Sequence, residues 1–277
     1  MTIFKQKLQH ASATNRSLVC IGLDPDLDKM PTKDVYEFNQ KIIEATADLV
    51  CAYKPNLAYY ESLGLPGLID LEKTISYIKN KASDVLIIGD GKRGDIGSSS
   101  EAYARAMFQV WGFDAVTINS WGGRDTVEPF VADEKYGAFI WCRGSNPGSS
   151  DLQDLIVKSH NDEIPLYEHL AKESRNWGRN NLGLVVGATV PDQLRNIRQI
   201  CPDTPILVPG IGTQGGDLIS AITNGVDSHG RSAIISSSRG IIYASRDSDF
   251  PDAARNAALI LRDSINQILD GEGKGWH

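Results

Sequence analysis

The residues best suited to chemistry are the charged ones in Asp90-Gly91-Lys92-Arg93-Gly94-Asp95, which follows the apolar run 85–88. A buried strand seldom ends in alternating fixed charges, because each desolvated charge destabilises the fold unless it is paired. In extended backbone, Asp90 and Lys92 point to the same side. Asp90 can then hold the Lys92 ammonium protonated, with Lys54 from the neighbouring strand end on its other side. A lysine fixed in this way is a proton donor suited to quenching a carbanion.

Eight apolar runs predict the strands that must position these charges. Continuous apolar runs are typical of strands buried on both faces in a parallel sheet. The predicted strands are Leu18–Leu23, Leu49–Lys54, Val85–Asp90, Ala115–Asn119, Ala138–Cys142, Leu182–Val186, Pro205–Val208 and Ala233–Ser237. Helical periodicity between them predicts helices over Pro66–Lys81, Ser98–Trp111, Val190–Ile200 and Pro251–Asp270.

This alternation of strands and helices predicts the architecture. Eight β→α steps in about 250 residues match the size of a (β/α)8 TIM barrel. A doubly wound open sheet is the alternative, and we prefer the barrel because eight units fill it without remainder. We find no linker, so residues 1–277 are expected to form a single barrel domain. The longest irregular stretch, Gly144–Asp162, is predicted to be a connection within the fold.

Polar residues gather where the predicted strands end, which is the functional face of a barrel. Any one of them fits a capping or solvated-loop role, but the joint pattern indicates a site. Besides the charged hexapeptide, the candidates at these ends are Asp24, Lys54, Asn119, Ser145, Ile211, Gln214, Ser238 and Arg239.

The last two strand ends predict a phosphate site. The glycines of Gly210–Gly216 let backbone N–H groups approach an anion, and Arg239 supplies a forked donor. The same segment matches G-x-G-x-x-G. A dinucleotide fold would need an acidic residue about 20 positions on, and Ser232–Ser237 contains none, so nicotinamide binding is disfavoured.

Composition narrows the possible partners. The chain has 277 residues and a net charge of −7, which gives no reason to expect nucleic acid or an anionic membrane as a partner. No run approaches the length of a membrane span, and the amino-terminal residues lack the apolar segment of a signal peptide. Four cysteines without a C-x-x-C pair favour reduced thiols in the cytoplasm. Five scattered histidines disfavour a metal site.

The motifs together resemble those of the orotidine 5′-phosphate decarboxylase family. Its D-x-K-x-x-D-I/V-G/P-x-T motif corresponds to residues 90–99, where Ser99 stands in place of threonine. That change keeps the hydroxyl and loses a methyl group. The similarity extends over essentially the whole chain, through the segments Gly22–Pro25, Tyr53–Asn56, Arg143–Gly148, Pro209–Asp217 and Ser237–Ile241. The S-N-P-G segment resembles the bacterial branch of longer chains.

The resemblance implies a function: decarboxylation of orotidine 5′-phosphate to UMP and CO2 without metal or organic cofactor. It also implies a homodimer with shared active sites. Lys92 would protonate C6 of the pyrimidine, and Asp90 would brace Lys92 and Lys54. Asp95 would enter the site of the other subunit.

The remaining roles concern the substrate. The resemblance implies that Asp24 and Lys54 hold ribose hydroxyls with Ser99 from the other subunit, and that Ser145 contacts the pyrimidine. Phosphate would be bound by Gln214, Ser238 and Arg239. Asn119 and Ile211 complete the candidate substrate contacts.

Two alternatives stay open. A metal-dependent 3-keto-gulonate-phosphate-type decarboxylase or hexulose-phosphate synthase could use the same barrel and would need carboxylates for Mg²⁺. A catalytically silent phosphate-binding sensor could keep Arg239 and the glycines, but would have no need of Lys92 between two acids.

Overall fold

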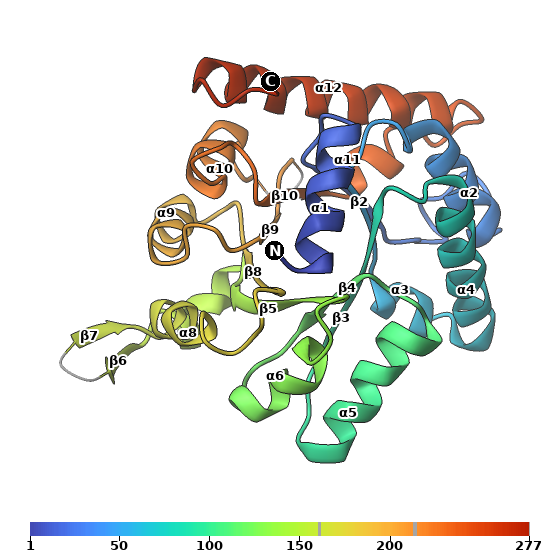
Figure 1. The fold of residues 1–277 in the computed structure, drawn as a ribbon. Helices are drawn as coiled ribbons and strands as arrows, with labels where there is room; N and C mark the ends of the chain where they lie inside the picture. The colour runs from blue at the N-terminus through green and yellow to red at the C-terminus, as the bar shows by residue number, and fades with distance from the viewer. Residues whose placement is uncertain (160–161, 213–214, 277) are drawn as a thin grey trace.

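The strands of the computed structural model, which describes residues 1–159, 162–212 and 215–276, close into a parallel barrel. Their order around the barrel is β1-β10-β9-β8-β5-β4-β3-β2. The strands are β1 (Val19–Leu23), β2 (Ala52–Pro55), β3 (Leu86–Arg93), β4 (Ala115–Ile118), β5 (Gly137–Arg143), β8 (Leu182–Val186), β9 (Ile206–Pro209) and β10 (Ala233–Ser237). All eight predicted strands are present, so the TIM barrel is confirmed and the open sheet is excluded (Figure 1).

Helices of the described chain cover the outside of the barrel. The longer ones are α2 (Val35–Thr46), α4 (Gly64–Lys81), α5 (Gly97–Arg105), α6 (Arg124–Val131), α8 (Leu166–Ser174), α9 (Pro191–Ile200), α10 (Leu218–Gly225) and α12 (Phe250–Gly271). Short helices α3 (Leu57–Glu61) and α11 (Arg239–Ile242) follow strands β2 and β10.

The four predicted helices are confirmed with shifted ends. Pro191 begins α9 as expected, and α4 and α12 each begin before their predicted proline. The second of them, Ser98–Trp111, is helical as far as Val110 but changes type along its length. There the α-helix ends at Arg105 and continues as a single π-helical segment, η1 (Ala106–Val110).

An amino-terminal helix that the strand and helix patterns did not predict closes one end of the barrel. In α1 (Ile3–Thr14) the side chain of Thr2 accepts a hydrogen bond from the Lys5 N–H and caps the helix. Phe4 and Leu8 are buried in the cluster that fills the barrel interior, and the Phe4 ring meets Phe139 edge to face at 6.0 Å. Figure 1 shows α1 across this end, which leaves the carboxyl ends of the strands for function.

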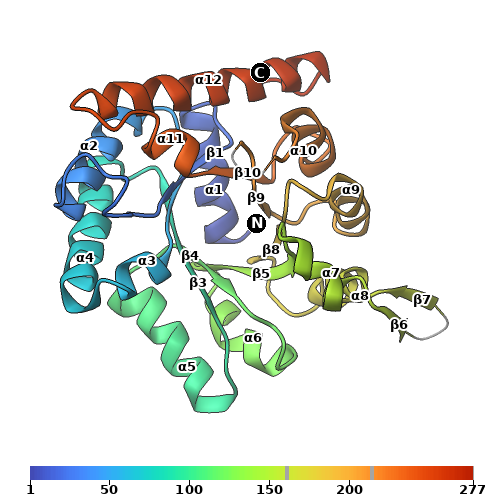
Figure 2. The ribbon, with the colours of Figure 1, turned by 180° about the vertical axis from the view of Figure 1, so that it is seen from behind.

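The segment after β5 is more ordered than predicted. It contains a 3-10 turn, η2 (Pro147–Ser149), the short helix α7 (Ser150–Gln153) and an antiparallel hairpin of β6 (Ile156–Ser159) and β7 (Asp162–Pro165). The prediction of an irregular connection was therefore wrong. Figures 1 and 2 show the hairpin projecting from the barrel.

All four cysteine thiols are free and buried, as expected for reduced thiols in the core. Burial raises the pKa of Cys20 to about 12, so that thiol is protonated at neutral pH. Within the described ranges, no helix combines the length and the apolar character needed to cross a membrane.

Candidate active site

A cavity of about 430 Å³ opens at the carboxyl ends of the strands. It brings together eight of the predicted site residues from six different strand ends. These are Asp24, Lys54, Asp90, Lys92, Ser145, Ile211, Ser238 and Arg239. The concentration of these side chains in one cavity makes it the candidate active site.

Asp90 is the centre of the charged cluster. Lys54 Nζ lies 2.7 Å from Asp90 Oδ2, and Lys92 Nζ lies 2.7 Å from Asp90 Oδ1. The Asp90 and Lys54 side chains are only 9% and 7% exposed, whereas that of Lys92 is 39% exposed. Both lysines line the cavity, and Lys92 is the more accessible of the two ammonium groups.

The paired charges stay ionised despite their burial. Desolvation alone would raise the pKa of Asp90, but the positive charges of Lys54 and Lys92 outweigh it and hold this pKa well below its usual range. Desolvation alone would lower the pKa of Lys54. Attraction to Asp90 and Asp24 outweighs that effect, so the pKa of Lys54 lies above its ordinary value.

The backbone that presents Lys92 is not extended as predicted. Lys92 has φ of 44°, and the pairing of β3 with β4 shifts register between Gly89 and Arg93. Thr117 on β4 stabilises this bulge: its hydroxyl accepts from the Lys92 N–H at 3.0 Å and donates to Asp90 Oδ1 at 2.7 Å. The predicted contact of Asp90 with Lys92 is confirmed, but a bulge and not simple strand alternation produces it.

The predicted phosphate end of the cavity is formed by β9 and β10. Arg239 is exposed at the start of α11, and the Ser238 hydroxyl donates to the Gly22 carbonyl oxygen at 3.1 Å. Gly210 and Gly212 adopt φ of 105° and 83°, which is readily accessible only to glycine. Gln214 lies outside the described residues.

Comparisons with known proteins show the family of this chain. Residues 17–249 match the model of the "Orotidine 5'-phosphate decarboxylase / HUMPS family". The chain belongs to this family. A relative named orotidine 5′-phosphate decarboxylase from Thermomicrobium roseum is 46% identical over 96% of this chain and 95% of its own. One from Cellvibrio japonicus is 47% identical over 95% of this chain and 98% of its own.

A solved structure supports the fold of this family member. The orotidine monophosphate decarboxylase of Leishmania donovani superposes with a TM-score of 0.83 at 34% identity. The alignment covers 97% of this chain and 98% of that one. The similarity therefore includes the whole barrel and the strand ends that carry the cavity.

Three of the predicted site residues that the structure describes lie outside the cavity. Asp95 is exposed on the connection from β3 to α5, where its carboxylate accepts from the Ile96 N–H, and Ser99 is exposed in the first turn of α5. Asn119 accepts from the Trp121 N–H and lines a separate cavity beside β5. Their roles stay predictions, and for Asp95 and Ser99 the prediction already assigned them to the site of another subunit.

Several residues that line the cavity of this family member were not among the predicted site residues. They are Asn56, Tyr59, Thr117, Trp141, Ser236 and Ser237. Thr117 left a detectable signal, because a hydroxyl in the apolar run Ala115–Ile118 needs a buried hydrogen-bond partner. Trp141 gave no signal in the sequence. Its side chain is exposed between buried neighbours, at a point where the pairing of β5 with β8 shifts register.

The described residues contain no group of three or more His, Cys, Asp or Glu side chains that could hold a metal ion. In the charged cluster, both carboxylate oxygens of Asp90 already face ammonium groups. Operation without a metal or organic cofactor remains the prediction for this member of the family.

The depressed pKa of Asp90 makes stability depend on pH in the acid range. In the unfolded chain the Asp90 carboxylate has a pKa of about 4 and takes up a proton as the pH falls through that value. In the folded protein its pKa is lower, so the carboxylate stays ionised at that pH. The stabilisation is therefore present above about pH 4 and is lost as the pH falls towards the folded-state pKa. Urea unfolding from pH 5 to pH 3 should show a steeper loss for wild type than for Asp90→Asn. Equal slopes would contradict the assignment.

Proposed function

We propose that this protein decarboxylates orotidine 5′-phosphate to UMP and CO2, the last step of de novo pyrimidine synthesis. The observation that carries the proposal is the Lys54–Asp90–Lys92 cluster, which presents a half-exposed ammonium to the cavity. The names of the relatives supply the substrate. We further propose that residues 1–277 form one barrel domain and act in the cytoplasm.

The chemistry needs a fixed positive charge. Loss of CO2 from C6 leaves an electron pair in the ring plane, and Lys92 stabilises that charge and then delivers the proton. Asp90 fixes the ammonium through its 2.7 Å contact and remains ionised itself. Because the cluster is preorganised, it need not be rearranged when charge develops at C6.

The sugar and phosphate ends have their own partners in this proposal. Asp24 Oδ1 is buried with no hydrogen-bond partner among the described residues, so a ribose hydroxyl can supply the missing donor. Lys54 assists there, and Ser145 contacts the pyrimidine. Ile211 and Asn119 are proposed substrate contacts. Arg239, Ser238 and Gln214 are proposed to bind the phosphate.

We also propose a homodimer with shared sites. Asp95, Ile96 and Ser99 are exposed beside the rim, and Ile96 is 67% exposed although it is apolar. In the dimer, Asp95 and Ser99 of the partner subunit would complete each site. Sedimentation of the active protein as a monomer would contradict this arrangement.

The direct test follows the absorbance change as purified protein consumes orotidylate, with and without EDTA. Turnover that is unaffected by EDTA is expected. Loss of activity with the chelator would favour the metal-dependent sugar-phosphate decarboxylase, and UMP binding without turnover would favour the sensor. Absence of both binding and turnover would exclude the proposed function.

Removal of the proposed phosphate ligand should weaken catalysis without affecting the fold. Arg239→Ala should lower kcat/KM about tenfold to a hundredfold, because hydrogen bonds to charged groups contribute about 1.5–3 kcal/mol. Inorganic phosphate should also inhibit the variant less. Arg195→Ala is the control, since that exposed side chain pairs with Asp192 on α9. Equal inhibition of variant and wild type by phosphate would disprove the assignment.

A further inference from the structure

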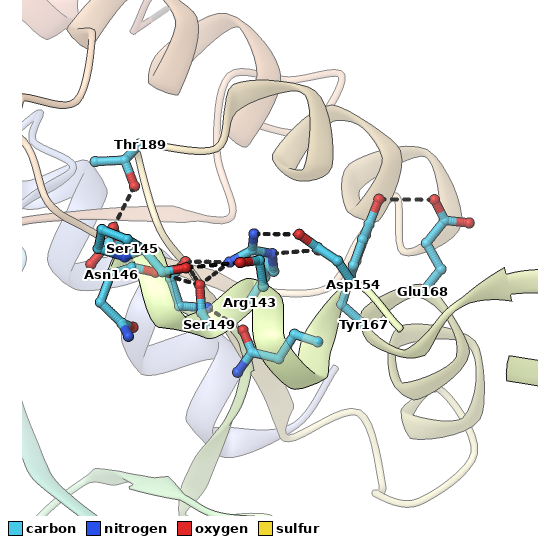
Figure 3. Close-up of polar contacts among 12 residues, drawn as sticks. Arg143, Ser145, Asn146, Ser149, Asp154, Tyr167, Glu168 and Thr189 are labelled. Atoms are coloured by element: carbon cyan, nitrogen blue, oxygen red, sulfur yellow. Dashed lines mark hydrogen bonds and ion pairs between the residues drawn. The ribbon is translucent and has the colours of Figure 1, made fainter. Parts of the chain in front are cut away.

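The loop that carries Ser145 is held by a buried arginine whose charge faces away from the substrate cavity. Arg143 ends β5, and its side chain is 5% exposed. Its guanidinium contacts both carboxylate oxygens of Asp154, with Nε to Oδ1 and Nη2 to Oδ2 each at 2.9 Å (Figure 3). A pair with two parallel hydrogen bonds fixes the orientation of the guanidinium in addition to neutralising its charge.

The same guanidinium reaches back to the loop. Its Nη1 donates to the Gly144 carbonyl oxygen at 3.0 Å and to the Ser149 hydroxyl. The Ser149 hydroxyl lies 2.6 Å from the Asn146 carbonyl oxygen, to which it donates. Arg143 thus constrains the peptide groups on both sides of Ser145.

Contacts from two other segments complete the support. The Gly144 N–H donates to the Gln153 side chain at 2.8 Å, and Thr189 donates to the Ser145 carbonyl oxygen at 2.8 Å. Gly187 lies so close that a Cβ there would be 2.6 Å from Ser145 Cα. Side chains therefore hold the backbone from residue 144 to residue 146, although loops of this kind are usually mobile.

We propose that Arg143, oriented by Asp154, is a positioning residue that sets Ser145 against the base of the substrate. The inference rests on the proposed function, in which Ser145 contacts the pyrimidine. It assigns a purpose to the segment after β5, because α7 supplies Gln153 and is directly followed by Asp154. Misplacement of Ser145 should weaken recognition of the base and leave the distant phosphate contacts intact.

The test uses Asp154→Asn, because Asp154 is 34% exposed and its replacement leaves Arg143 in place. UMP binding and kcat/KM for orotidylate should each fall about tenfold, as expected for weakening one charged hydrogen-bonded pair. Affinity for ribose 5-phosphate, which lacks the base, should be unchanged. Asp162→Asn is the matched control, because Asp162 lies in the same segment, its side chain is 70% exposed, and its ion pair with Lys172 is long at 3.8 Å.

The outcomes distinguish failure of the positioning role of Arg143 from failure of the proposed decarboxylase function. Wild-type protein that fails to consume orotidylate disproves the function. If wild type is active, unchanged UMP binding in Asp154→Asn overturns the inference, as does an equal loss of affinity for UMP and ribose 5-phosphate. In a Ser145→Ala background, the effect of Asp154→Asn on kcat/KM should shrink to less than about twofold, because contacting residues that act together are non-additive. A full tenfold effect there would also overturn it.

Discussion

Lys92→Ala should lower kcat for orotidylate by about a thousandfold or more while the protein stays folded, because the variant loses both the proton donor and a fixed charge in the site. UMP should still bind, since the phosphate and ribose contacts come from other strand ends. The measurement is single-turnover absorbance, with UMP affinity determined by calorimetry on the same preparation.

Lys172→Ala provides the control for this result. The Lys172 side chain is 40% exposed, close to the 39% of Lys92, and like Lys92 it pairs with a carboxylate. Lys172 lies on α8, away from the cavity, so its removal should leave kcat at the wild-type value. Decarboxylation by Lys92→Ala at the wild-type rate would exclude Lys92 as the proton donor.

Asp90→Asn should abolish turnover and also destabilise the fold by about 3–5 kcal/mol, because it leaves the buried Lys54 ammonium without its carboxylate. Urea unfolding at pH 7 measures the change in the free energy of unfolding. Asp48→Asn is the control. The Asp48 carboxylate is 62% exposed in its pair with Arg255, so the change there should be below about 1 kcal/mol.

A second variant distinguishes loss of the Lys54–Asp90 ion pair from other effects of Asp90→Asn. Replacing Lys54 by Met in the Asp90→Asn background removes the unpaired charge. Neutral replacements for a buried ion pair are often well tolerated. The double variant should therefore regain much of the lost stability while remaining inactive. If Asp90→Asn unfolds at the wild-type urea concentration, the carboxylate does not hold the cluster together.

The strand ends could be predicted because the apolar runs of a buried parallel sheet are distinctive in sequence. Once the barrel was inferred, Asp24, Lys54 and Arg239 had to lie on one rim, and the structure places them in one cavity. The contacts of Asp90 with its two lysines were also predicted, although the backbone geometry that brings Lys92 to Asp90 was not.

Other features depended on tertiary packing that sequence patterns do not encode. The positive φ of Lys92 accompanies a hydrogen bond that its N–H donates to the hydroxyl of Thr117, a residue on another strand. The short elements β6 and β7 lie in a segment too polar for strand prediction. The place of Asp95 cannot be derived from one chain, because the proposed site for it belongs to a second subunit.

The amino-terminal helix α1 has a consequence for how products depart. Phe4 and Leu8 fill the barrel from the end opposite the cavity, so neither CO2 nor UMP can escape along the barrel axis. In the proposed reaction both leave through the rim by which orotidylate arrives. UMP and the next substrate molecule therefore use one opening and one set of contacts in turn, and UMP is expected to inhibit competitively.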